Sequence, residues 1–214
     1  MIYVEQMKKI EPYYTTIEAK LALDNGGRFF NILTKANDGE IELSELSRVA
    51  GVFGEKQKMI LFFDLAISKL RANDKSMVIS SLSDGLRETY EKYKSQVLTA
   101  TQASELGELS KNIIVTGTPK LIDSKTDFNG FIMIPIMAGK VMTFTMIPII
   151  DRYDVYEIRD QKSSETFLIA HAKGKLKLPE KQIVVGGILK ELKANKEEKT
   201  GTKRYLEAYY FMDV

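Results

Sequence analysis

Hydrophobic and polar positions follow two different patterns along the chain, one in each half. In the first half, apolar residues recur three and four positions apart, which is the spacing of one face of an α-helix. The clearest such stretches run from Lys56 to Leu70 and from Met77 to Val97. In the second half, short runs rich in β-branched and aromatic residues alternate with polar positions, as strands do. The pattern therefore predicts helices followed by strands, with the change near residue 110.

Turn and capping residues divide the first half further. Gly26-Gly27 stops one helix, and residues 28–36 carry apolar side chains at helical spacing. Asn37-Asp38-Gly39 then marks a turn, and Ser44 is a candidate N-cap for the next helix. Together these signals predict a bundle of four to five helices.

Seven short strands are predicted in the second half, each bounded by turn residues. They span residues 112–122, 131–137, 141–150, 153–160, 166–172, 182–192 and 204–212. About 100 residues are enough for one small barrel core. We therefore expect an α+β protein with two domains, a helical bundle at residues 1–110 and a β-barrel at residues 111–214.

One apolar segment of the second half occurs twice. The sequence Phe131-Ile-Met-Ile-Pro-Ile-Met is echoed by Phe144-Thr-Met-Ile-Pro-Ile-Ile. Proline cannot donate to a β-ladder, so each Ile-Pro-Ile belongs at an edge, a bulge or a corner. One interpretation is an exposed hairpin that docks a partner or dips into a membrane, with Phe131, Met133, Met137, Phe144 and Met146 as contacts. The other is a hairpin that folds onto the barrel or the helical half as core, which the rarity of large exposed apolar patches on monomers favours.

Composition narrows the function without identifying it. Lys+Arg 31 and Asp+Glu 29 give a net charge of +2, so no strong field attracts nucleic acid or membranes. Cysteine is absent, which excludes disulfides and thiolate chemistry. The single histidine excludes metal sites that need two imidazoles and most catalytic triads. The opening residues lack the apolar run of a secretory signal, so we expect a cytoplasmic protein. We also expect no membrane span, no metal and no cofactor.

The acidic turn from Asp38 to Glu45 matches the second half of a calcium-binding EF-hand loop. The first and third positions of that loop would be Thr34 and Ala36, which do not supply the carboxylate or amide oxygens that the ion needs. The turn is also similar to the helix-linking turn of tellurite-resistance-type helical domains. A helix connector is the favoured interpretation, and calcium binding stays open.

His171 and the lysines that follow it are the other candidate functional groups. His171 shares a side of its predicted strand with Phe167 and Ile169, which predicts a half-buried imidazole with no catalytic role. The lysines between residues 173 and 203 can neutralise phosphates. Glutamates are interleaved with them and dilute the field within about one Debye length.

Four segments of the second half carry the pattern of a known fold. Ile114-Val-Thr-Gly-Thr-Pro reads as a first strand with a glycine, and residues 156–160 and 166–170 read as a central pair. The last two strands of this pattern are predicted at residues 178–189 and 204–211. The apolar hairpin is inserted between the first and second strands. With these features the C-terminal half resembles the OB-fold, a five-stranded antiparallel Greek-key barrel that often binds oligonucleotides.

The resemblance implies a non-enzymatic module that binds single-stranded nucleic acid. Its contacts would be Tyr156, Arg159, Lys173, Lys175, Lys177 and Lys190. The alternative is a protein–protein interaction or assembly component that uses the 131–150 hairpin or the barrel edge, including association with itself. An enzyme is the third interpretation, and it would need two carboxylates converging in a pocket.

Overall fold

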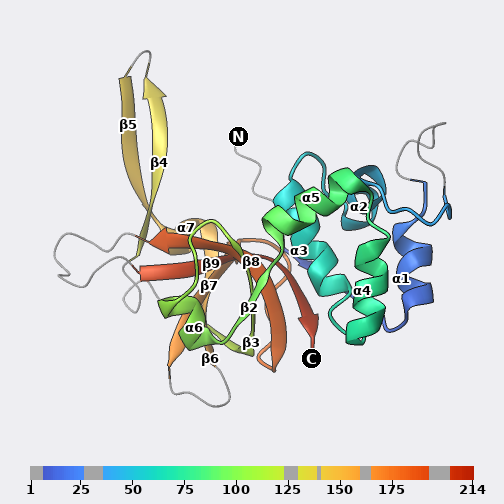
Figure 1. The fold of residues 1–214 in the computed structure, drawn as a ribbon. Coiled ribbons are helices and arrows are strands. Elements are labelled where there is room, and N and C mark those ends of the chain that lie inside the picture. The colour runs from blue at the N-terminus through green and yellow to red at the C-terminus, as the bar shows by residue number, and fades with distance from the viewer. Residues whose placement is uncertain (1–6, 27–35, 123–129, 139–140, 160–164, 193–202) are drawn as a thin grey trace. The chain divides into compact units, whose positions relative to one another are not determined.

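The computed structural model describes residues 7–26, 36–122, 130–138, 141–159, 165–192 and 203–214. The chain divides into two compact units, Lys9–Ser95 on one side and Met1–Lys8 with Gln96–Val214 on the other (Figure 1). A domain boundary near residue 110 stays a prediction. Residues 96–105 form a strand and a helix that pack against strands of the second unit.

The described part of Lys9–Ser95 is mainly helical. Its helices are α1 (Thr16–Leu23), α2 (Leu43–Ala50), α3 (Lys56–Ala66), α4 (Ala72–Ser80) and α5 (Asp84–Tyr93). Helix α3 packs against α2 and α5, while α1 packs against α2 and α4. The mixed α and β character is confirmed, and the arrangement of these helices as a bundle stays a prediction.

The single helix predicted from Met77 to Val97 is wrong, because a break separates α4 from α5. At the break the backbone pairs with Ile41. The N–H of Ile41 donates to the carbonyl of Ser81 at 2.7 Å, and the N–H of Ser83 donates to the carbonyl of Ile41 at 3.0 Å. This bridge diverts backbone groups that a continuous helix would use, and it comes from a residue about forty positions away.

Two further expectations for this unit have different outcomes. Helix α2 begins at Leu43, so its N-cap is Glu42 and not Ser44. The side chain of Glu45, three residues later, completes a capping box. The helix expected over residues 28–36 lies, except for Ala36, outside the described residues.

Five strands of the second unit form a closed barrel. They are β3 (Asn112–Leu121), β6 (Tyr153–Arg159), β7 (Thr166–Ala172), β8 (Ile183–Leu192) and β9 (Lys203–Asp213). Strand β3 pairs with β6 and β8, β6 pairs with β7, and β9 closes the ring by pairing with both β7 and β8. This barrel is compatible with the predicted OB-like fold.

We expected every strand pair of the barrel to be antiparallel, and this expectation is wrong. The β7–β9 pair is parallel. Strand β8 lies between these two strands in the sequence and pairs with β3 and β9 on the other side of the ring. Because β8 returns the chain across the barrel, β9 enters in the same direction as β7.

Smaller elements complete the sheet and one side of the core. Strand β1 (Lys8–Lys9) is at one end of the strand order, and β2 (Gln96–Leu98) pairs in parallel with β3. Helix α6 (Ala100–Glu105) packs on β3, β7 and β9. Its residues Ala100 and Ala103 join the barrel core, which includes Tyr156, Phe167 and Leu178.

Two glycines allow neighbouring strands to approach closely. A Cβ atom at Gly117 would lie 2.3 Å from the carbonyl oxygen of Arg159 on β6. A Cβ atom at Gly187 would lie 2.3 Å from the carbonyl oxygen of Glu207 on β9, next to a shift in register between β8 and β9. Only glycine fits at either position without displacing the partner strand.

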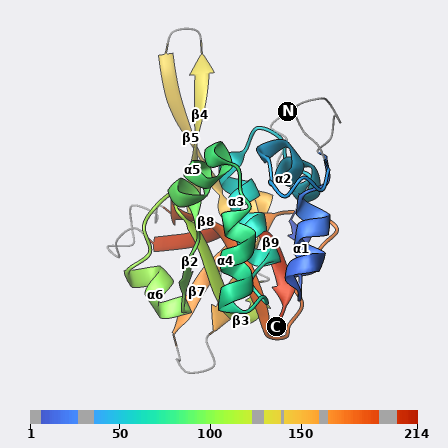
Figure 2. The same cartoon turned by 45° about the vertical axis from the view of Figure 1, so that its right-hand side comes forward.

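The apolar hairpin forms a separate two-stranded sheet, β4 (Phe131–Ala138) and β5 (Val141–Pro148), followed by the short helix α7 (Ile149–Arg152). As predicted, it is inserted between the first and second barrel strands. Of the two core positions expected for it, packing on the barrel is wrong, because the hairpin extends away from the barrel (Figure 1, Figure 2). The helix α7 that follows the hairpin contacts β6. The ring of barrel strands is already closed between β3 and β6, so it offers the hairpin no free edge there.

Candidate functional site

The residues predicted to contact nucleic acid do not lie together on one surface. Tyr156 is buried in the barrel core, and Arg159 and Lys173 lie near opposite ends of the β6–β7 ladder. Arg159 pairs in register with Thr166, whereas Lys173 follows the other end at Ala172. Six residue steps along a strand separate these ends by about 20 Å.

Two of the predicted lysines are held by carboxylates of the barrel. Lys177 forms an ion pair with Asp154, with 2.6 Å between Nζ and Oδ1. Lys190 forms an ion pair with Glu207. Lys173 and Lys175 are exposed on the connection between β7 and β8.

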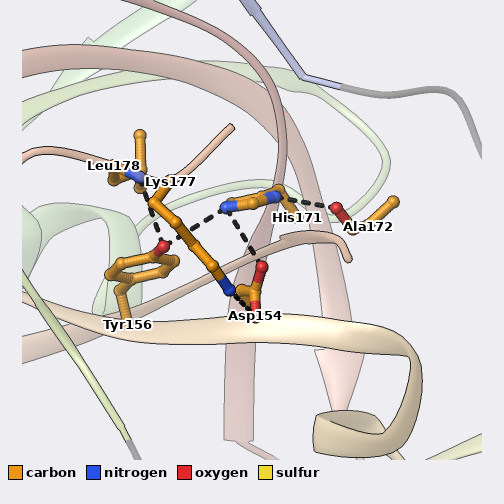
Figure 3. Close-up of polar contacts among 6 residues, drawn as sticks. All are labelled: Asp154, Tyr156, His171, Ala172, Lys177 and Leu178. Carbon is orange, nitrogen blue, oxygen red and sulfur yellow. Dashed lines mark hydrogen bonds and ion pairs between the residues drawn. The ribbon is translucent and has the colours of Figure 1, made fainter. Parts of the chain in front are cut away.

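A buried polar network lies at the end of the barrel where β6 begins and β7 ends (Figure 3). His171, only 1% exposed, is the cross-strand partner of Asp154. Its Nδ1 lies 2.9 Å from the carbonyl oxygen of Ala172. A carbonyl oxygen only accepts, so Nδ1 carries the hydrogen and Nε2 of the neutral ring carries the lone pair. The predicted place of His171 within a strand is confirmed, but the imidazole is fully buried and not half-buried as expected.

Tyr156 connects this histidine to the loop that covers the end of the barrel. Its hydroxyl oxygen accepts a hydrogen bond from the backbone N–H of Leu178 at 3.2 Å. The same hydroxyl lies 3.4 Å from Nε2 of His171, to which it can donate, and the two rings stack with centroids 5.5 Å apart. Leu178 is buried in the barrel core, so the connection between β7 and β8 closes this end where no helix is present.

Asp154 is the charged member of the network. Its Oδ1 meets Lys177, while its Oδ2 is buried and has no hydrogen-bond donor among the described residues. That oxygen lies 4.0 Å from Nε2 of His171. Burial lowers the pKa of His171, and the nearby Asp154 counters this shift in part.

A second polar cluster lies around Glu207 on β9. The hydroxyls of Tyr153 and Tyr209 and the ammonium of Lys190 all contact the Glu207 carboxylate, with 2.9 Å between Tyr153 Oη and Oε1. Burial alone would raise the pKa of Glu207, but these three partners hold it below its usual value. The carboxylate is therefore ionised and fully engaged within the protein.

A small apolar cluster is formed by residues of α7 and of strands β6, β7, β8 and β9. It contains Ile149, Val155, Ala170, Leu192 and Tyr205. In OB-folds the face of the second and third strands is the one that binds oligonucleotides. In this barrel the second and third strands along the chain are β6 and β7, and Ile149 of α7 packs with Val155 and Ala170 on them.

The predicted partner-binding residues are brought together by the hairpin. In its register Met133 pairs with Met146, Pro135 with Phe144, and Phe131 with Pro148. Because residues alternate between the faces of a sheet, Phe131, Met133, Met137, Phe144 and Met146 all belong to one face. Met146, the one of the four methionines of this face (with Met133, Met137 and Met142) whose exposure is described, is 46% exposed.

Two carboxylates at the acidic turn of the helical unit, Glu45 within it and Asp24 outside it, accept hydrogen bonds from backbone amides. The N–H groups of Asp38 and Gly39 donate to Asp24, at 3.2 and 2.8 Å. Those of Gly26 and Glu42 donate to Glu45. Within the part of the chain that is described, no group of three or more acidic or histidine side chains is placed to hold a metal ion. Nor is any helix there long and apolar enough to cross a membrane.

Sequence reasoning missed Asp154, Tyr153, Tyr209 and Glu207. The sequence held one signal for Asp154. Alternation predicts that His171 faces inward, and an inward-facing imidazole needs a polar partner, which the adjacent strand can supply. No protein-family model matches the chain, and a search of curated proteins finds no match either. The function must therefore be inferred from the barrel, its polar clusters and the hairpin.

Proposed function

We propose that this protein is a non-enzymatic interaction module whose β4–β5 hairpin inserts into an apolar groove of a protein partner. The observation that carries this proposal is that the hairpin forms its own sheet and extends away from the barrel with two apolar faces. The barrel then serves as the scaffold from which the hairpin projects.

Both faces of the hairpin are apolar in sequence. One carries methionine, phenylalanine and proline throughout, and the other carries aliphatic residues with Thr143 and Thr145. Neither strand contains a charged residue. An isolated two-stranded hairpin is marginally stable at best in water, so a surface that covers both faces would stabilise it.

The prolines argue for docking through the faces and not through the strand edges. In an antiparallel pair, every second residue points its N–H away from the partner strand. Because the β4–β5 register is continuous at Pro135 and Pro148, both prolines occupy such outward-facing positions. Each proline therefore removes a donor from an outer edge. Edges blunted in this way resist the addition of another strand.

The size of the hairpin favours a groove over a second copy of the same hairpin. Each eight-residue strand is about 27 Å long, and the pair is about 10 Å wide, so one face offers about 270 Å². Two hairpins stacked face to face would bury about 540 Å² in total, well below the about 1,000 Å² expected of a specific interface. A groove that covers both faces would bury about twice as much.

The test begins with a photo-crosslinking residue in place of Met146. Any captured protein is purified, and its affinity is measured for the wild type, Met146→Lys and Val97→Lys. Val97 is 75% exposed in the same unit but lies outside the hairpin. We expect Met146→Lys to weaken binding at least tenfold and Val97→Lys to bind like the wild type. Equal affinity of all three proteins, or a solution mass that shows self-association through Met146, would contradict the proposal.

Binding of single-stranded nucleic acid by the barrel is a second candidate. It is favoured by the OB-compatible ring of strands and by two neighbouring exposed lysines, Lys173 and Lys175. Its test is the fluorescence anisotropy of a labelled mixed-sequence oligonucleotide at two salt concentrations. Salt-weakened binding that disappears when both lysines are replaced by glutamate would support this function, and no binding at low salt would exclude it.

A further inference from the structure

We propose that His171 is a pH-sensitive latch whose protonation releases residues 174–180, in the connection between β7 and β8, from the end of the barrel. This inference rests on the polar network of Figure 3 and is independent of the function proposed for the hairpin. The latch concerns the middle of the connection. Its ends are held separately, by the backbone of Lys173 on Arg152 and by an ion pair between Lys181 and Asp213.

Two polar contacts tie the middle of the connection to β6. The backbone N–H of Leu178 donates to the Tyr156 hydroxyl at 3.2 Å, and Lys177 Nζ lies 2.6 Å from Asp154 Oδ1. Both anchoring residues also face Nε2 of His171, at 3.4 and 4.0 Å. A change at one nitrogen atom therefore reaches both ties.

The neutral imidazole suits both ties. Its Nε2 lone pair accepts from the Tyr156 hydroxyl, which leaves the oxygen of that hydroxyl to accept from Leu178. Protonation turns Nε2 into a donor, so the Tyr156 hydroxyl loses its acceptor. The new donor faces Asp154 Oδ2, the buried oxygen that has no donor in the described structure.

Charge balance decides which group then leaves. The groups that face the imidazole are Asp154 and Tyr156 from β6 and Lys177 from the connection. One carboxylate balances one cation, and protonation of His171 places a second cation beside it. His171 is fully buried, whereas the Lys177 side chain is 53% exposed. Lys177 is therefore the cation that moves to water, and the adjacent Leu178 is drawn from its site.

Burial supports a transition on the acid side of neutrality. It lowers the pKa of His171, and Lys177 acts in the same direction. The carboxylate of Asp154 acts in the opposite direction.

Amide exchange followed by NMR tests the latch on the full chain. The His171 ring signals report its protonation, and the protection factors of the Leu178 and Val185 amides are compared at each pH. Val185 lies on β8 in the barrel core and reports opening of the whole barrel. We expect Leu178 to lose at least tenfold in protection as His171 protonates, with Val185 unchanged. Constant protection at Leu178, or a parallel loss at Val185, would overturn the proposal.

Two variants separate the charge argument from a general loss of structure. His171→Gln cannot take up the proton, so protection at Leu178 should be independent of pH. Lys177→Met keeps the apolar stem but removes the competing cation, so the protonation midpoint of His171 should rise. A midpoint that does not move would show that Lys177 and His171 do not compete for Asp154. If either variant fails to fold, the amide exchange of the wild type still tests the proposal.

Discussion

Tyr153 donates a hydrogen bond to Glu207 across an intervening strand, with 2.9 Å between Oη and Oε1. Strand β7 lies between the two residues, and it carries Ala170 and Ala172 in register with them. These small side chains leave room for the tyrosine ring to reach β9. The hydrogen bond therefore links β6 to β9 across β7.

Tyr153→Phe should lower the free energy of unfolding by about 1–2 kcal/mol, because a buried carboxylate loses a donor. Phenylalanine keeps the ring and removes the hydroxyl that donates to Glu207. The measurement is urea denaturation. Tyr14→Phe, at an exposed position, is the matched control and should change stability by less than about 0.5 kcal/mol. Equal effects of the two substitutions would contradict the assigned role of Tyr153.

Gly117→Ala should destabilise the barrel by about 3 kcal/mol. The added Cβ atom would lie 2.3 Å from a carbonyl oxygen of β6, and rigid backbone has to move to accept it. Gly85→Ala is the control, because its Cβ meets nothing within 4 Å and the position lies in helix α5. That substitution should stabilise the protein by about 0.5–1 kcal/mol. The measurement is thermal unfolding of both variants. An unchanged stability of Gly117→Ala would show that β3 and β6 lie farther apart at Gly117 than the structure places them.

Asp64 should make the helical unit less stable as the pH rises from about 4 to 6. Burial raises the pKa of Asp64 to about 6, above the usual value of about 3.9 for an aspartate, although the N–H of Ser95 donates to its carboxylate. Between these values the folded chain binds more protons than the unfolded chain, so the free energy of unfolding falls with rising pH. The loss is about 3 kcal/mol and is complete above pH 6. Urea denaturation at several pH values should show this fall in the free energy of unfolding in the wild type and not in Asp64→Asn. The same pH dependence in both proteins would contradict the prediction.

Met146→Lys should leave the stability of the barrel unchanged within about 0.5 kcal/mol, because the hairpin extends away from it. Leu178→Ala, by contrast, should cost about 2–5 kcal/mol, since that side chain is buried in the core. Thermal unfolding followed by circular dichroism compares the two variants. A large loss in Met146→Lys would mean that the hairpin packs on the protein.

Much of the barrel could be predicted from alternation alone. The strand Thr166–Ala172 has the predicted bounds, and the others differ by one or two residues. The common face of the five predicted hairpin contacts also follows from alternation. The break between α4 and α5 could not be predicted, because it depends on Ile41, which is distant in the sequence.

The engagement of the lysines could not be predicted for a similar reason. Alternation shows which face a residue occupies, but not which carboxylate lies across from it. Lys177 meets Asp154, and Lys190 meets Glu207, only because the barrel brings their strands and connection together. A cluster of basic residues in the sequence therefore overstated the charge available to a ligand.

The position of β9 in the ring has a consequence for folding during synthesis. Of the five barrel strands this one is made last, and it joins β7 to β8. Until it leaves the ribosome, the edges of β7 and β8 stay open and the barrel core is exposed to water. The helices of Lys9–Ser95 make their contacts within a short length of chain and need not wait. We therefore expect the helical unit to fold first, and a nascent chain that stalls before residue 203 to be prone to aggregation.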